Sequence, residues 1–180
     1  MKTLIATATL TLSLAAAAQA QVMVGGAEMM ADRTIVENAV NSADHTTLVA
    51  ALQAADLVET LSGEGPFTVF APTNAAFDMI SDETLESLMM PENKAQLAQI
   101  LTCHVVAADA MAAAIKGMID DDGGAHPVPT VGGCTLSATY EGDEITLTDE
   151  NGREASVTIA DVDQSNGVIH VIDRVLLPKQ

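Results

Sequence analysis

Aromatic side chains and cations are both scarce in this chain of 180 residues. Aromatic residues make up 2%, with no Trp, so the chain lacks the aromatic faces on which bases or sugar rings stack. Seven Lys and Arg stand against 25 Asp and Glu, giving a formal net charge of −18. Clustered cations bind phosphate backbones, so we expect no nucleic-acid partner, and anionic membrane surfaces would repel the chain.

Recognisable catalytic motifs are also missing. The sequence has no Gly-x-Ser-x-Gly elbow, no phosphate-cradling glycine loop and no His-Glu-x-x-His pair. Cys103 and His104 are adjacent, but neighbouring positions on a helix point about 100° apart and do not face each other. No residue can be named as a nucleophile, so we do not expect an enzyme.

The first residues have the pattern of a secretory signal. Lys2 precedes an apolar run over residues 4–18, and the Ala-Gln-Ala at the end of this segment predicts cleavage after Ala20. The protein is therefore expected to be secreted or periplasmic. Residues 21–32 show no clear period and are expected to form a flexible N-terminus.

One stretch organises the rest of the chain. Residues 67–71 alternate with the period of a strand between two prolines, and Thr73 or Asn74 can cap the helix that follows. The best partner for this strand is the apolar run within residues 166–178. Side by side, the two segments would enclose everything between them in one domain.

The apolar pattern changes along the chain. Helical spacing dominates residues 35–118, and strand alternation with hairpin signals dominates from residue 128 onward. Hydrophobic residues make up 48%, enough for a sizeable aliphatic core. We predict an α+β fold in which a helical N-terminal half packs on a β-sandwich or wedge, formed by one early strand and the C-terminal strands.

Three segments carry a family resemblance. GPFTVFAPTNAAF at residues 65–77 and NGVIHVIDRVLLP at residues 166–178 resemble the two signature segments of the fasciclin I domain. CHVV at residues 103–106 resembles the family's intermediate tyrosine-histidine segment, with Cys where Tyr is usual. The order of all three segments matches, and the resemblance runs from about Ile35 to Pro178.

The resemblance implies a compact domain used in adhesion and surface association, without catalysis. We therefore expect a signal peptide over residues 1–20, the flexible segment, and one fasciclin-like domain over residues 33–180. The expected partner is an unknown protein or glycan at the cell envelope, because a basic protein or a neutral glycan is electrostatically easier than a polyanion. We expect a monomer, no cofactor and no membrane insertion.

The matched segments supply the candidate site residues. Candidates for contact with a partner are His104, Val105 and Asn74; structural roles are expected for Thr73, His170 and Asp173. His104 continues an apolar helical stripe, which favours a buried histidine bonded to a backbone group. His170 and Asp173 would lie on opposite faces of the last strand, and a buried Asp173 would need donors.

Cys103 and Cys134 are the only cysteines. In an oxidising compartment they predict a disulfide that ties the helical half to the sheet half, stabilising the fold by on the order of 4 kcal/mol. The alternative is two separate buried thiols that behave as small apolar residues.

Metal binding is the second class of function. The histidines, His45, His104, His126 and His170, show no paired ligand spacing, and the acids of residues 120–122 lack the alternation of a calcium loop. Nine methionines leave copper binding through Met and His ligands as the alternative function, since thioethers bind Cu(I). Methionines also fill cores that are poor in aromatics.

Overall fold

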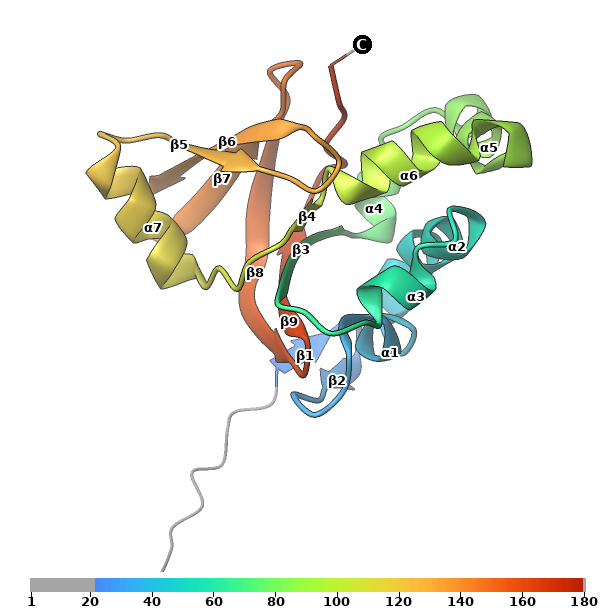
Figure 1. Ribbon diagram of the computed structural model, residues 1–180, viewed down its shortest axis with the longest axis horizontal. Helices are drawn as coiled ribbons and strands as arrows, with labels where there is room; N and C mark the ends of the chain where they lie inside the picture. Colours follow the sequence, from blue (N-terminus) through green and yellow to red (C-terminus); the bar gives the residue numbers. More distant parts are fainter. Residues whose placement is uncertain (1–21, 180) are drawn as a thin grey trace, which may run out of the picture.

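The computed structural model describes residues 22–179, so the predicted signal peptide lies outside the described residues. Helices and strands alternate early, and strands dominate late (Figure 1). The helices are α1 (Ile35–Ala39), α2 (Thr46–Ala54), α3 (Val58–Leu61), α4 (Asn74–Phe77), α5 (Asp82–Met89), α6 (Lys94–Thr102) and α7 (Ala112–Asp121), with 3-10 turns η1 (Ala43–His45) and η2 (Pro91–Asn93). The strands are β1 (Val22–Val24), β2 (Ala27–Met29), β3 (Phe67–Pro72), β4 (Val105–Val106), β5 (His126–Pro129), β6 (Thr135–Glu141), β7 (Glu144–Thr148), β8 (Glu154–Gln164) and β9 (Gly167–Ile172).

The main sheet has seven strands in the order β4-β3-β9-β8-β7-β6-β5. Strands β3 and β9 pair in parallel, with a register that runs from Phe67 opposite Gly167 to Pro72 opposite Ile172. The predicted neighbourhood of the two signature segments is therefore confirmed, and so is the α+β class.

The two paired strands are buried on both faces (Figure 1). Helices α1 to α6 cover one face, where Val69 and Val171 join the larger core cluster. Phe70 and Ile172 point to the other face and join a second cluster beneath α7 and strands β5 to β7. Both core clusters are largely aliphatic, as the scarcity of aromatic residues requires, with Phe77 and Phe70 as the main exceptions.

The loop that follows β5, the last strand in the sheet order, lies against β4, the first strand. The amide of Val131 donates to the carbonyl of Val105 at 2.8 Å, and the amide of Gly132 donates to that of Thr102 at 3.0 Å. The loop between β5 and β6 therefore closes against β4, and the predicted sandwich or wedge is a nearly closed sheet. Within residues 22–179 no helix is long and apolar enough to span a bilayer.

Residues 22–32 pack against the domain in the structure, where the sequence predicted a flexible N-terminus over residues 21–32. Strands β1 and β2 form a hairpin, and Val24 and Met29 are buried in the larger core cluster. Gly25 and Gly26 adopt positive φ angles, +58° and +75°, as a two-residue hairpin turn requires. The Gly-Gly pair between apolar residues was the sequence signal for this hairpin.

Gly167 begins β9 at a point where no side chain fits. Its φ is +154°, and a Cβ there would overlap the backbone of Phe67 on β3. We predict that Gly167→Ala lowers the free energy of unfolding by about 3 kcal/mol, because the parallel pair must separate at its first residues.

Gly117 in α7 is the matched control, since a Cβ there meets no atom within 4 Å. Gly117→Ala is expected to raise the free energy of unfolding by about 0.5–1 kcal/mol, as in an ordinary helix interior. Urea denaturation of both variants checks the pair. Equal effects of the two substitutions would refute the steric argument for Gly167.

Candidate functional site

His104 is a buried structural residue. Helix α6 ends at Thr102, with Cys103 as the C-cap, so His104 lies just beyond the helix whose apolar stripe it was expected to continue. The amide of Leu176 donates to Nε2 at 2.9 Å, so the ring proton is on Nδ1, which donates to the carbonyl of Ile100 at 2.8 Å. Burial lowers the pKa of His104 to about 4, so the ring is neutral at pH 7.

His170 on β9 binds the backbone of the loop that contains Ala110. The amide of Asp161 donates to its Nδ1 at 3.2 Å, so Nε2 carries the proton and donates to the carbonyl of Ala110 at 2.8 Å. Thr68 on β3 binds the same loop, donating to the carbonyl of Ala108 at 2.6 Å and accepting from the amide of Ala110 at 2.9 Å. The expected structural role of His170 thus has a clear geometric basis.

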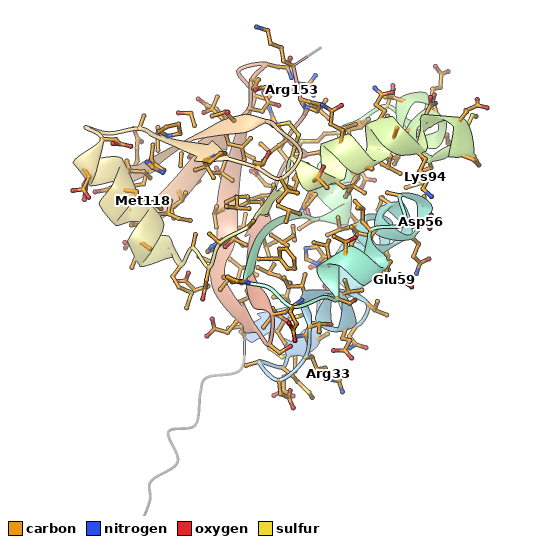
Figure 2. All side chains as sticks on the ribbon, in the orientation of Figure 1. Arg33, Asp56, Glu59, Lys94, Met118 and Arg153 are labelled. Atoms are coloured by element: carbon orange, nitrogen blue, oxygen red, sulfur yellow. A yellow bond between two sulfur atoms is a disulfide. The ribbon has the colours of Figure 1, made fainter. Side chains whose placement is uncertain are left out.

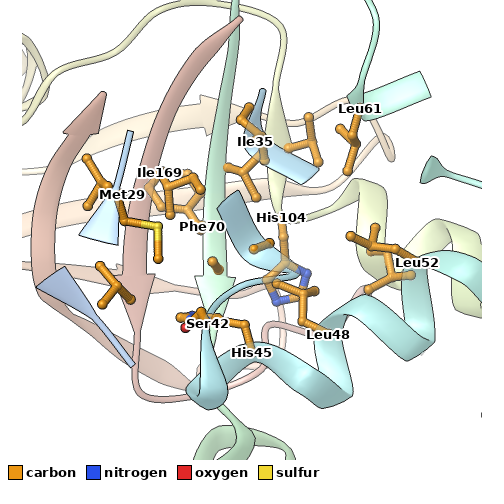
Figure 3. A pocket seen from close by; sticks show the side chains of 17 residues that line it. Met29, Ile35, Ser42, His45, Leu48, Leu52, Leu61, Phe70, His104 and Ile169 are labelled. Carbon is orange, nitrogen blue, oxygen red and sulfur yellow. The ribbon is translucent and has the colours of Figure 1, made fainter. Parts of the chain in front are cut away.

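His45 is the third buried histidine and borders a small cavity (Figure 3). Its Nδ1 lies 2.9 Å from the hydroxyl of Ser42, while Nε2 has no hydrogen-bond partner within the described residues. Burial lowers the pKa of His45, with the carbonyl of Ala71 and the charge of Asp44 acting in the opposite direction. The cavity measures about 20 Å³, room for about one water molecule, which is too small for a substrate.

Asn74 joins the first signature segment to the start of α2. Its Oδ1 accepts from the amide of Thr47 at 3.0 Å and the hydroxyl of Thr46 at 3.2 Å, and its Nδ2 donates to the carbonyl of Ala43 at 2.9 Å. Thr73 caps α4 by accepting from the amide of Ala76. Both side chains therefore serve the fold.

Asn166 plays the same structural role in the second signature segment as Asn74 does in the first, and the sequence did not predict this role. Its Oδ1 accepts from the amide of Ile35 at 3.0 Å, and its Nδ2 donates to the carbonyls of Leu61 at 2.8 Å and Gly63 at 2.9 Å. The Asn-Gly pair that opens the segment marks this position in the sequence, but such a pair is more typical of a hairpin turn.

The structure corrects two assignments. His104 and Val105 are 2% and 3% exposed, so neither is accessible for contact with a partner on the folded surface. Asp173 lies beyond the end of β9 and is exposed, so it does not oppose His170 within the strand. Its Oδ1 instead accepts from the amide of Ser156 at 2.8 Å and ties the chain after β9 to β8.

Cys103 and Cys134 form a disulfide, as predicted, with their Cα atoms 5.4 Å apart. The bond joins the end of α6 to the start of β6 at the seam where the sheet closes. Both residues are buried, so the disulfide supports the same closure as the hydrogen bonds between the β5–β6 loop and β4.

The copper hypothesis gains no support from the geometry. Within residues 22–179 no group of three or more His, Cys, Asp or Glu side chains is arranged to hold a metal ion. His104 and His170 bond to the backbone through both ring nitrogens, and Met29 lies in the core. These nitrogen and sulfur atoms are therefore occupied by structural contacts.

Comparison with known proteins agrees with this architecture. The family model of the fasciclin domain matches residues 43–178, and the chain belongs to that family. The insect cell adhesion molecule Fasciclin I, solved as a FAS1 domain pair, has the same fold, with a TM-score of 0.71 and 18% identity over 81% of this chain and 51% of that one.

Similar proteins occur in bacteria and animals. Protein sll1483 of Synechocystis is 48% identical over 81% of this chain and 73% of its own length. The immunogenic protein MPB70 of Mycobacterium bovis is 32% identical over 83% of this chain and 71% of its own length. The transforming growth factor-beta-induced protein ig-h3 of Sus scrofa is 35% identical over 73% of this chain, which spans 17% of that larger protein.

We predict that acid destabilises the fold through His104. Its pKa of about 4 lies below the usual 6.5, so the unfolded chain takes up the proton first as the pH falls. The contribution is present above about pH 6.5 and is lost down to about pH 4, with a total of about 3 kcal/mol. Urea midpoints measured across this range check the slope.

His104→Gln serves as the control for this pH dependence. The variant is less stable at pH 7, because the bonds to Ile100 and Leu176 are disturbed, but it has a shallower pH slope. His45 and His170 also have lowered pKa values and contribute in the same direction, so part of the slope remains. An unchanged slope in His104→Gln would contradict the assignment.

We predict that Cys103→Ser with Cys134→Ser lowers the free energy of unfolding by about 3 kcal/mol, because the bond closes a loop across 31 positions. Chemical denaturation of the variant and the oxidised protein measures the difference. Mass spectrometry after alkylation supplies the control, since thiols should react only after reduction of the unfolded protein. Alkylation without reduction would mean that the bond is absent.

Proposed function

We propose that this protein is an exported, non-catalytic binding module that associates surfaces at the cell envelope. Proteins with fasciclin domains are linked to cell adhesion or surface association, and this chain belongs to that family. One observation carries the proposal: the buried polar side chains of the matched segments bind backbone groups of the fold, which leaves recognition to the exposed surface.

The structural roles of these polar side chains argue against catalysis. His104, His170, Asn74 and Asn166 each hold backbone groups of other elements. A general base or nucleophile needs a side chain that reaches a substrate, with a group to orient it. The polar side chains of these segments therefore serve to fix the strands and helices in place.

Export is supported by the N-terminal pattern and by the disulfide. Disulfides persist in oxidising compartments, which include the periplasm and the extracellular space. A related protein of Mycobacterium bovis, 32% identical over 86% of this chain, is a cell surface glycolipoprotein, MPB83. We propose that this chain is likewise exported and is secreted or periplasmic after cleavage at Ala20.

Charge restricts the partner. With a formal charge of −18, long-range repulsion disfavours polyanions and anionic lipid surfaces. A neutral glycan or a protein of net positive charge meets no such barrier. We propose that the partner belongs to one of these two classes and that the module acts as a monomer.

The test is retention of an envelope component by the immobilised mature protein. We expect saturable binding of a basic protein or a neutral glycan from the envelope fraction of the source cells. The matched control is the same protein with Gly167→Ala under conditions in which it is unfolded. Failure to retain any component at low and high salt would overturn the proposal.

A further inference from the structure

An open groove with about 520 Å³ of free space brings apolar side chains and two cations together. Its lining residues are Ala76, Met79, Ile80, Arg153, Arg174 and Val175. Four of them are apolar, and the other two are arginines in a chain that has only seven cations. We call this site the arginine groove.

The two arginines are free to meet a ligand. Both are exposed, and none of the ion pairs among residues 22–179 includes either one. Lys94 and Lys116, by contrast, pair with Asp56 and Asp143. Asp173, next to Arg174 in the chain, directs its Oδ1 to the amide of Ser156. Two unpaired guanidinium groups on one groove therefore offer donors for an anion.

Hydrogen bonds within the protein hold the backbone of Arg153 in place. Its amide donates to Oδ1 of Asp149 at 3.0 Å, and its carbonyl accepts from the amide of Asp149 at 2.9 Å. The Asp149 side chain is buried and also binds the amide of Leu177 through Oδ2 at 3.0 Å. Because this backbone is already ordered, less conformational entropy is lost when a ligand binds the guanidinium of Arg153.

The backbone of Arg174 is held from both sides. Asp173 exchanges hydrogen bonds with Ser156, and Leu176 donates to the ring of His104 at 2.9 Å. Val175 and Ala76 are buried and form a rigid apolar floor. The groove is therefore built on the same anchors that hold the two signature segments together.

The apolar wall is unusually open for this protein. Met79 is 62% exposed, the highest value among the exposed large hydrophobic residues of the described chain. Methionine is flexible and polarizable, so it adapts to apolar groups of different shape. Next to it, a guanidinium presents a planar fork that binds a carboxylate with two parallel hydrogen bonds.

We propose that the arginine groove binds an extended segment of a partner protein in which an aspartate or glutamate adjoins an aliphatic residue. The inference rests on the proposed function as a binding module. The carboxylate binds the guanidinium groups, and the aliphatic side chain packs on Met79 and the floor. An open groove of this kind suits a peptide segment, because small-molecule sites enclose most of the ligand surface.

The net charge of the chain also limits which partner can bind in the arginine groove. Long-range repulsion still favours a partner of neutral or positive net charge, whereas the groove requires only one local carboxylate. Beyond about 8 Å at physiological salt, exposed charges are largely screened, so the local pair decides the contact. A basic or neutral protein with one acidic-aliphatic segment satisfies both conditions.

The test uses a short fluorescein-labelled peptide with one aspartate between two leucines and flanking lysines that neutralise its net charge, with fluorescence anisotropy as the readout. We expect saturable binding, at least about tenfold weaker with Arg153→Ala plus Arg174→Ala, because charge-assisted bonds are lost. Arg174→Lys should show an intermediate loss, since the charge stays and the fork does not. Replacing aspartate by asparagine in the peptide should also abolish most of the binding.

The matched control is Arg33→Ala, which removes another cation that is outside the described ion pairs. Figure 2 places Arg33 and Arg153 at opposite ends of the molecule. The control should bind the peptide like the unmodified protein, and melting temperatures confirm that every variant folds. Equal weakening by Arg33→Ala, or no binding of the peptide, would overturn the inference, as would equal binding of the asparagine peptide.

The envelope assay separates this inference from the proposed function. If the protein retains an envelope component equally well with and without the two arginines, the groove assignment fails and the binding module stands. If the unmodified protein retains nothing from the envelope but binds the peptide through both arginines, the proposed function fails and the groove stands. Tighter binding to inorganic phosphate than to the peptide would overturn the choice of occupant.

Discussion

The parallel pairing of β3 and β9 is the constraint on which the structure depends. Two parallel neighbours cannot be joined by a tight turn, so the chain between Pro72 and Gly167 must form a long crossover. That crossover contains α4 to α7 and β4 to β8, and it covers both faces of the pair. The double core follows, since each face of the pair needs its own apolar cover.

Polar side chains secure the ends of this pair. Asn166 binds α1 and the chain after α3 at the start of β9, while His104 receives the amide of Leu176 beyond its end. Each buried donor or acceptor that is left unpaired costs about 1–3 kcal/mol, so these residues tolerate little change. Their role explains why polar residues lie in otherwise apolar segments without serving a ligand.

The sequence predicted the arrangement of the long apolar segments and missed features set by single residues. Residues 65–77 and 166–178 are long and strongly patterned, so their pairing and the α+β class were accessible. The β1–β2 hairpin was missed because its strands are too short to show a period. The burial of His104 was predicted from the apolar stripe of α6, whereas the burial of Val105 depends on β4, a strand of two residues that is too short to show a period. The arginine groove joins residues from three separate segments, and only the fold brings them together.

The anchors of the fold and the arginine groove share residues, and this coupling has a physical consequence. Leu176 binds His104 in the core, while Arg174 projects to the groove two positions earlier. Loss of the neutral ring of His104 in acid would loosen the segment that positions one guanidinium, even though the charge of the arginine is unchanged. Binding at the groove, in turn, would order the same segment and stabilise the pair β3–β9, since a ligand that binds only the folded state stabilises it. Recognition and stability in this domain are therefore linked through the backbone that follows β9.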